Sequence, residues 1–260
     1  MNRLLSSNLF RLRKNTYFGL ALISALIGPA YTIINNWYYK KFYEYPLFAD
    51  EPFIMVAKDY FFVIALTVVI ALFIGTEYSD KTIRNKIIIG HSRLSVFIAN
   101  LVTSVIIAVA MYLVGALIAF VGIPLLGGFE LPIDKLIIQM LFAVVSVSVL
   151  AVFVCSITTV IGNRVVSIIV SLLSMIGLQI LPPTLWSNIY FYTEDGLLDT
   201  FRAKIDLILY DVLPTCQLYQ YTSCLEDIPK NIYLFPIYSL ALIGIIGAFA
   251  VLVFRKKNLK

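Results

Sequence analysis

Long apolar segments alternate with short polar ones along this chain of 260 residues. A helix that crosses a bilayer needs about 20 mostly apolar residues, and the pattern predicts six such helices. Their expected ranges are 16–34, 60–74, 95–121, 136–161, 165–181 and 232–254. None of these ranges alternates polar and apolar residues as a transmembrane strand does. The predicted fold class is therefore an all-α integral membrane protein with six transmembrane helices.

Residues 1–14 form a separate basic segment ahead of the first span. Leucines recur on one face of the helix that this segment predicts, and basic or polar residues recur on the opposite face. The two sets are Leu5, Leu9 and Leu12, and Arg3, Ser7, Arg11 and Lys14. Such a helix is expected to lie in the interface of an anionic leaflet. A frayed and solvated basic tail is the alternative.

The section from 182 to 231 separates the fifth and sixth spans. Pro182 and Pro183 are expected to end the fifth span, because proline has no backbone donor and disfavours helix in the preceding residue. Apolar residues recur at roughly helical spacing between 197 and 209, which predicts one or two short helices at the outer interface. Cys216 and Cys224 both fall here, so either a disulfide or two free thiols is possible.

The charged segment from Gly75 to Arg93 lies between two strongly apolar runs. Ser79 or Asp80 is expected to cap a short helix there, and Gly90 to end it in the left-handed conformation. Ser92 is then placed to cap the following span. Ile83 and Ile87 share one face of the short helix. A surface helix of this kind suits docking into the groove of a partner, but a simple loop that sets topology explains the charges equally well.

Composition supports the membrane assignment, since 60% of the residues are hydrophobic and only 13% are charged. The net charge of +5 comes from basic residues gathered in alternate loops. Residues 1–14, 75–93 and 255–260 each hold four Lys or Arg, and Arg164 adds one, whereas the same segments hold only Glu77 and Asp80 as acids. By the positive-inside rule both termini face the cytoplasm. This distribution needs no nucleic-acid partner.

Motifs for catalysis or metal binding are not found in the sequence. One histidine, His91, and three cysteines at unsuitable spacings exclude the usual zinc motifs. The centres of the spans carry no charge, which disfavours an ion pump. An intramembrane enzyme or a passive channel remains a remote alternative, since neither paired carboxylates nor a nucleophile elbow is present. A phosphate-binding loop, Gly-x-x-x-x-Gly-Lys-Ser/Thr, is absent too, so ATP hydrolysis would have to come from another protein.

The run Glu-Tyr-x-x-x-Thr-Ile-Arg-Asn-Lys from Glu77 to Lys86, followed by Gly-x-Ser-Arg at 90–93, resembles the signature between spans 2 and 3 of ABC-2 type transporter permeases. The layout of the whole chain is similar to theirs as well. The resemblance implies that residues 77–90 form a coupling helix that contacts a separate ATPase, and that residues 1–14 form the connecting helix. The implied coupling residues are Glu77, Tyr78, Thr82, Ile83, Arg84, Asn85 and Ile87.

The resemblance also implies the partners and the location. The chain would be a permease in a bacterial cytoplasmic membrane, paired with a second permease chain, identical or related, and with two copies of an ABC ATPase that bind ATP and magnesium. The expected cargo is an amphipathic peptide such as a bacteriocin or a cytolytic peptide. Efflux of a membrane-active antibiotic or lipid-like drug, for self-immunity, is the alternative within the family.

Spans 2 and 5 would face the translocation path if the resemblance holds. The candidate lining residues are Phe62, Leu66, Val69, Phe73, Ser167, Ser171 and Ser174. Small hydroxyl residues in membrane helices also serve helix packing, and this is the simpler interpretation of the three serines. The predicted lining is apolar with a few hydroxyl groups, which suits an amphipathic cargo.

Overall fold

The computed structural model describes residues 2–43, 56, 59–126, 133–223 and 231–257, and these residues form helices joined by short turns, with no strand among them. The helices are α1 (Asn2–Arg13), α2 (Thr16–Tyr43), α4 (Tyr60–Ser79), α5 (Thr82–Ile88), α6 (Arg93–Leu126), α7 (Ile133–Ile161), α8 (Arg164–Glu194), α9 (Phe201–Val212), α10 (Pro214–Ser223) and α11 (Phe235–Lys256), with a 3₁₀ turn at Ile232–Leu234. Six of them are long and apolar enough to cross a membrane. The predicted all-α membrane fold with six spans is confirmed.

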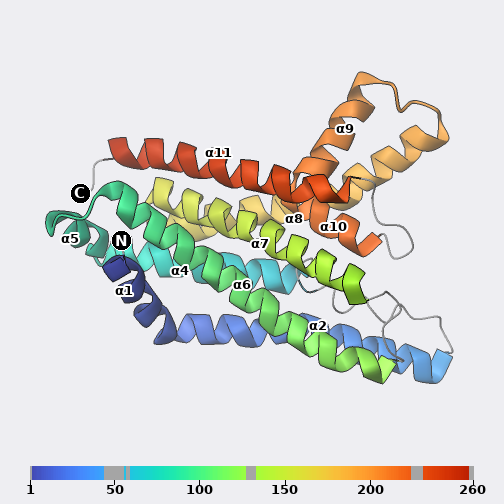
Figure 1. The fold of residues 1–260 in the computed structure, drawn as a ribbon, viewed down its shortest axis with the longest axis horizontal. Helices are drawn as coiled ribbons and strands as arrows, with labels where there is room; N and C mark the ends of the chain where they lie inside the picture. The colour runs from blue at the N-terminus through green and yellow to red at the C-terminus, as the bar shows by residue number, and fades with distance from the viewer. Residues whose placement is uncertain (1, 44–55, 57–58, 127–132, 224–230, 258–260) are drawn as a thin grey trace.

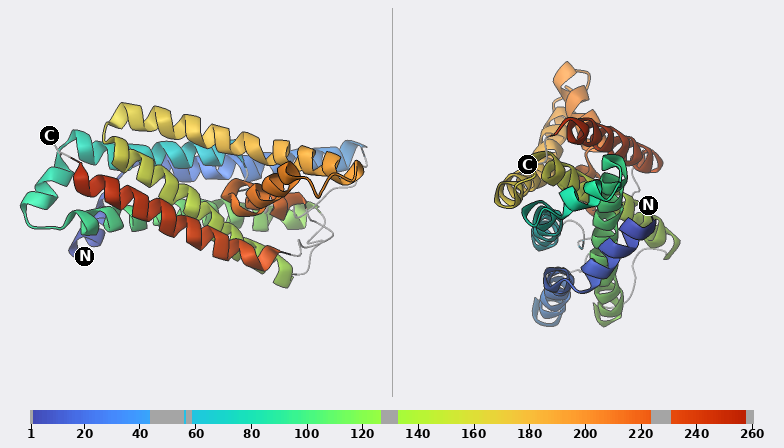
Figure 2. Two further views of the ribbon diagram at one scale, coloured as in Figure 1. Left: turned by 90° about the horizontal axis from the view of Figure 1, so that it is seen from above. Right: turned by 90° about the vertical axis from the view of Figure 1, so that its left-hand side faces the viewer.

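The six long helices run side by side along the long axis of the molecule (Figure 1). α1, α5 and both ends of the chain lie at one end of this bundle, and α9 and α10 lie at the other. We call these the α5 end and the α9 end. α1 crosses the α5 end at an angle to the long helices (Figure 2).

α4 and α7 form the interior of the bundle, and both bury most of their apolar residues inside the protein. α4 packs against α8, α7 packs against α11 and α6, and α2 packs against α6. α11 lies at the periphery and leaves most of its apolar surface free to face lipid. The large side chains at the centre, including Leu66, Ile70, Ile107 and Leu150, are fully buried.

α8 differs from the sequence prediction, because it continues through Pro182 and Pro183 to Glu194. Pro182 cannot donate to the carbonyl of Leu178 as a helical residue normally does. Thr215 of α10 supplies the missing donor, since its Oγ1 lies 2.9 Å from the oxygen of Leu178. A neighbouring helix that satisfies the freed carbonyl lets a membrane helix tolerate proline, so the expected end of the span at residue 181 is wrong.

Two short helices, α9 and α10, occupy the section between α8 and α11, as the sequence predicted. α10 is anchored in the bundle by Gln217, whose Oε1 accepts hydrogen bonds from Ser146 of α7 at 2.9 Å and from Ser239 of α11 at 2.7 Å. α9 extends away from the bundle (Figure 1). Its apolar side chains Phe201, Ile205 and Ile208 are exposed.

Candidate functional site

Glu77 in the last turn of α4 is fully buried and is surrounded by side chains from three other helices. Arg11 of α1 donates from Nη1 to Glu77 Oε1 at 2.6 Å, and Lys86 of α5 donates to the same oxygen. Asn100 of α6 donates from Nδ2 to Oε2 at 2.9 Å. A buried carboxylate is stable only when charges and hydrogen bonds compensate for its lost hydration. Glu77 therefore joins α1, α4, α5 and α6 at one point.

Asn8 of α1 completes this group, which we call the Glu77 cluster: Asn8, Arg11, Glu77, Lys86 and Asn100. Asn8 donates to Asn100 Oδ1 at 2.8 Å and accepts from Lys86 Nζ at 3.1 Å. The cluster holds two cations and one anion, so one formal positive charge is left over. Phe73 helps to stabilise this charge on Arg11. Arg11 donates to the backbone oxygen of Phe73 at 3.0 Å, and its guanidinium carbon lies 3.8 Å from the centroid of the Phe73 ring.

α1 turns a different face to the protein from the one that its sequence predicted. Leu4, Asn8 and Leu12 are buried, and Arg11 points inward to Glu77, whereas Leu5 and Leu9 lie on the outer side. The prediction had placed Arg11 on the solvated face. The buried carboxylate of Glu77, 66 residues away, determines the orientation of α1. Leaving this carboxylate without a cation would cost far more free energy than exposing leucine side chains.

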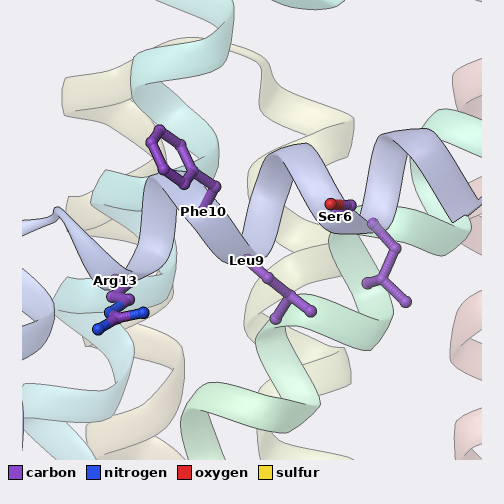
Figure 3. Close-up of a pocket in the computed structure, with 5 residues that line it drawn as sticks. Ser6, Leu9, Phe10 and Arg13 are labelled. Carbon is purple, nitrogen blue, oxygen red and sulfur yellow. The ribbon is translucent and has the colours of Figure 1, made fainter.

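The outer side of α1 carries a shallow pocket of about 480 Å³ (Figure 3). Leu5, Ser6, Leu9, Phe10 and Arg13 line it. All five come from this one helix, so the pocket is a hollow of its surface and not a cleft between elements. An exposed apolar surface beside a basic residue is typical of a helix that lies at a membrane interface.

α5 begins later than the sequence predicted, and its cap is different. Residues through Ser79 continue α4, so Glu77 and Tyr78 belong to that helix and not to the short one. Lys81 is the residue before α5, with a left-handed φ of 57° and no side-chain cap. Neither Ser79 nor Asp80 caps α5. Ser79 is the last residue of α4 and Asp80 is its C-cap, so both come before the turn at Lys81. The predicted range of 77–90 therefore contains the end of one helix and all of the next.

The turn that follows α5 agrees with the prediction. Gly90 has a φ of 103°, which is open to glycine and disfavoured for other residues. Ser92 caps α6, since its Oγ accepts a hydrogen bond from the backbone nitrogen of Ser95 at 3.1 Å.

The exposed surface of α5 differs from the set of residues that the sequence singled out. Ile83 is buried against the bundle, and Ile87 is partly buried against it. Arg84 and Asn85 are exposed as expected. Ile88 and Ile89 are 70% and 79% exposed, and the sequence analysis did not select them. The run Ile87-Ile88-Ile89 was the available signal, since three consecutive isoleucines on a short helix cannot all face the protein.

Tyr78 and Thr82 hold the connection between α4 and α5 in place. Thr82 Oγ1 donates to the backbone oxygen of Glu77 at 3.1 Å. Tyr78 OH donates to the backbone oxygen of Thr159 near the end of α7 at 2.9 Å. Of the seven residues predicted for this site, Arg84 and Asn85 face outward, and the others position the helix from inside or remain partly covered.

A second group of cations lies at the same end of the bundle. Arg93, the first residue of α6, donates from Nη1 to the carbonyl oxygens of Phe254 at 3.0 Å and Lys257 at 2.5 Å, at the end of α11. Lys257 Nζ donates to the oxygens of Thr159 at 3.0 Å and Val160 at 2.8 Å, at the end of α7. Cations at helix C-termini satisfy free carbonyls and oppose the helix dipole. The turn after α5 is thus tied to α11, and α11 to α7.

The residues predicted to line a path lie on α4 and α8, which pack against each other, but the ring of Phe73 lies under Arg11 of α1. Phe62, Leu66, Val69 and Phe73 are buried on α4, and Ser167 and Ser171 are buried on α8, while Ser174 is partly exposed. The Oγ atoms of Ser167 and Ser171 have no hydrogen-bond partner among the described residues. The two helices approach closely at Gly75, where an added Cβ would lie 3.1 Å from Arg164 Cα. The role of these residues as a lining stays a prediction.

Cys216 is fully buried and forms no disulfide with another described residue. Burial raises the pKa of this thiol to about 12. Cys224 lies outside the described residues, so the disulfide between the two stays a prediction.

Six spanning helices around an interior of buried side chains define a multi-pass membrane protein. The model of the ABC-2 family transporter proteins matches residues 4–178, a segment that contains the whole Glu77 cluster and α5. The chain belongs to this family, whose members are membrane subunits that work with a separate ABC ATPase. No curated protein matches the chain.

Proposed function

We propose that this chain is the permease subunit of an exporter that moves an amphipathic peptide, such as a bacteriocin or a cytolytic peptide, out of the cell. A separate ATPase subunit, present in two copies and binding ATP and magnesium, supplies the energy, and a second permease chain completes the path. The observation that carries this proposal is the Glu77 cluster, because it links α5 to the long helices through buried charges.

The ATPase binds at the outer surface of α5. α5 forms the tip of its end of the bundle (Figure 1), beyond the long helices. Ile88 and Ile89 supply two exposed apolar anchors there, with Arg84 and Asn85 beside them. A few large apolar residues with a polar rim are typical of a small docking surface. Because basic residues concentrate at this end, it faces the cytoplasm, where ATP is available.

Movement of α5 is transmitted through Lys86 to Glu77 and hence to α4. α5 and α4 cannot separate at this point without leaving a buried carboxylate short of a cation, which makes the cluster a stiff connection. α4 in turn packs on α8, with Gly75 against the backbone of Arg164. The closed, ATP-bound ATPase binds more tightly to one arrangement of α4 and α8 than to the other. This difference in affinity shifts the permease from one state to the other.

The cargo follows from what lies between α4 and α8. Separation of the two helices would expose apolar side chains of α4 and the hydroxyls of Ser167 and Ser171, which lack partners among the described residues when the helices are packed. A surface of this kind suits a cargo with apolar faces and some hydrogen-bonding groups. Between Tyr60 and Gly75, α4 carries no charged residue that could face these serines. A small ion is therefore a poor fit as the cargo.

Affinity purification of the tagged chain from its native membrane, followed by identification of the bound proteins, tests the proposal. Wild type is expected to retain an ABC ATPase, and the double variant Ile88→Ser/Ile89→Ser should retain about tenfold less, as loss of a docking hot spot predicts. Arg84→Glu should act in the same direction. The matched control is Ile208→Ser, an exposed isoleucine of α9 at the other end.

Unchanged ATPase recovery and unchanged peptide export in the double variant would overturn the assignment of this surface. Ile83 is unsuitable for the test, because it is buried and its substitution would disturb the fold. Export of a peptide from loaded vesicles, compared with clearance of an added membrane-active antibiotic, distinguishes secretion from self-immunity.

A further inference from the structure

An apolar groove of about 410 Å³ opens on the surface of the bundle between α8 and α11, with α7 forming its floor. α7 lies between these two helices (Figure 2). Phe153, Ile157 and Val160 of α7, Val170 of α8, and Ile246 and Phe249 of α11 line it. The volume lies in the range of sites that hold small ligands. In a membrane protein such a groove on a lipid-facing surface is accessible to acyl chains.

The groove occupies the half of the membrane nearest the α5 end. Val160 lies in the last turn of α7, which ends at Ile161, and Val170 lies in the second turn of α8, which begins at Arg164. Phe249 lies two turns before the end of α11. An acyl chain in the groove would therefore belong to a lipid of the leaflet at the α5 end, with its headgroup near the turn between α7 and α8.

Two cations, Lys257 and Arg164, lie at this turn, and the Cβ and Cγ of Arg164 lie beside Gly75 of α4. Lys257 Nζ donates to the oxygen of Val160, a residue that lines the groove, at 2.8 Å. The same nitrogen lies against Gly162, two residues before Arg164. Among the described residues neither Lys257 nor Arg164 forms an ion pair. Burial lowers the pKa of Lys257, whose ammonium also lies 4.8 Å from the ring centroid of Tyr78.

Ser156 adds a polar feature to the wall of the groove. It lines the groove, is only 6% exposed, and its Oγ has no hydrogen-bond partner among the described residues. A buried hydroxyl without a partner is uncommon in a folded protein. The ester carbonyl that lies just below a phospholipid headgroup would provide an acceptor at this depth.

We propose that the groove binds one anionic phospholipid of the cytoplasmic leaflet, with an acyl chain between α8 and α11 and its phosphate against Arg164 and Lys257. Basic pockets between membrane helices on the cytoplasmic side bind anionic headgroups in this way. The proposal rests on the proposed function only for the orientation of the bundle.

Native mass spectrometry of the delipidated chain tests the site, with dioleoyl phosphatidylglycerol and dioleoyl phosphatidylcholine as probes. Wild type is expected to bind the anionic lipid about 25-fold more tightly, since each of the two cations contributes about fivefold near an anionic group. Arg164→Gln should weaken that preference about fivefold, the effect of one cation. Arg13→Gln on the outer side of α1 is the matched control at the same end of the protein.

Ile246→Trp fills the groove and should reduce binding of both lipids, whereas Leu173→Trp, on an exposed part of α8 outside the groove, should not. Thermal unfolding of each variant in detergent establishes that it is folded. Equal affinity of wild type for the two lipids, or full retention of the anionic lipid by Ile246→Trp, overturns the proposal.

A second copy of the chain is the other possible occupant of the groove. Efficient cross-linking of Phe249→Cys to the same residue of another copy in nanodiscs would show this and would also overturn the lipid proposal. The lipid titration uses the permease alone, so loss of ATPase binding in the α5 variants leaves its result unaffected. Labelling of Arg255→Cys from either side of sealed vesicles tests the shared orientation separately.

Discussion

Arg11 of the first helix and Glu77 at the end of α4 form an ion pair with a separation of 2.6 Å between Nη1 and Oε1. Glu77 is fully buried, whereas about a third of the Arg11 side chain is exposed. The pair fixes α1 across the α5 end of the bundle. Lys86 binds the same carboxylate oxygen, so the position of α1 and the position of α5 depend on one side chain.

Glu77→Gln is expected to lower the thermal unfolding temperature in detergent. The amide leaves two cations without a counterion. Breaking a buried ion pair costs about 3–5 kcal/mol, and less here because Arg11 is partly hydrated. Glu194→Gln, at an exposed position at the far end of α8, is the control and should have no effect. A second comparison uses the double variant Arg11→Gln/Glu77→Gln, whose loss should be smaller than the sum of the two single losses. Additive losses would mean that the two residues act independently.

Gly75→Ala is expected to destabilise the contact between α4 and α8. Its Cβ would lie 3.1 Å from Arg164 Cα, and overpacking of this kind costs about 1–3 kcal/mol. The same substitution at Gly177 meets no atom within 4 Å, so it should stabilise α8 by up to about 1 kcal/mol. Unfolding temperatures that move in opposite directions would support this difference, and a rise in both would refute the close approach.

Gln217→Leu is expected to loosen α10 from the bundle. It removes the acceptor of Ser146 and Ser239, and each buried hydroxyl left without a partner costs about 1–3 kcal/mol. Gln139→Leu is the matched change, because Gln139 Oε1 is buried and has no hydrogen-bond partner among the described residues. That variant should be neutral or more stable. Faster proteolysis near α10 in Gln217→Leu alone is the expected observation.

Cys216 is expected to resist alkylation while the protein is folded. Its pKa is raised to about 12, so at about pH 8 almost no thiolate is present, and the side chain is fully buried. Iodoacetamide labelling followed by peptide mass mapping measures this. Labelling after unfolding alone indicates a free thiol, whereas labelling that needs reduction as well indicates a disulfide with Cys224. Rapid labelling of Cys216 in the folded protein would contradict the buried environment.

The number of spans follows from the sequence because about 20 apolar residues in succession have few alternatives to a membrane helix. The ends of the spans were less predictable. α2 was expected to end at 34 but continues to Tyr43, and α4 was expected to end at 74 but continues to Ser79. Polar and aromatic residues near an interface do not stop a helix, so hydropathy underestimates its length.

The candidate site was only partly predictable for a different reason. Glu77, Arg84 and Asn85 stand in a recognisable local pattern, which directed attention to the correct turn of the chain. The partners of Glu77 come from α1 and α6, 66 and 23 residues away, and no local pattern specifies contacts at such separations. The exposure of Ile88 and Ile89 depends on the orientation of α5, which the left-handed conformation of Lys81 sets. A lysine rarely adopts this conformation, so the sequence gives no reason to expect it.

Through the hydrogen bond from Thr215 to the oxygen of Leu178, α10 stabilises α8 next to its two prolines. Without it, α8 has a weak point four residues before Pro182, since a carbonyl buried in a membrane helix would have no donor. α8 is therefore expected to bend more easily near Leu178 if α10 is displaced. Any cargo or partner that displaces α10 from outside changes the stiffness of a helix that reaches the opposite side of the bundle.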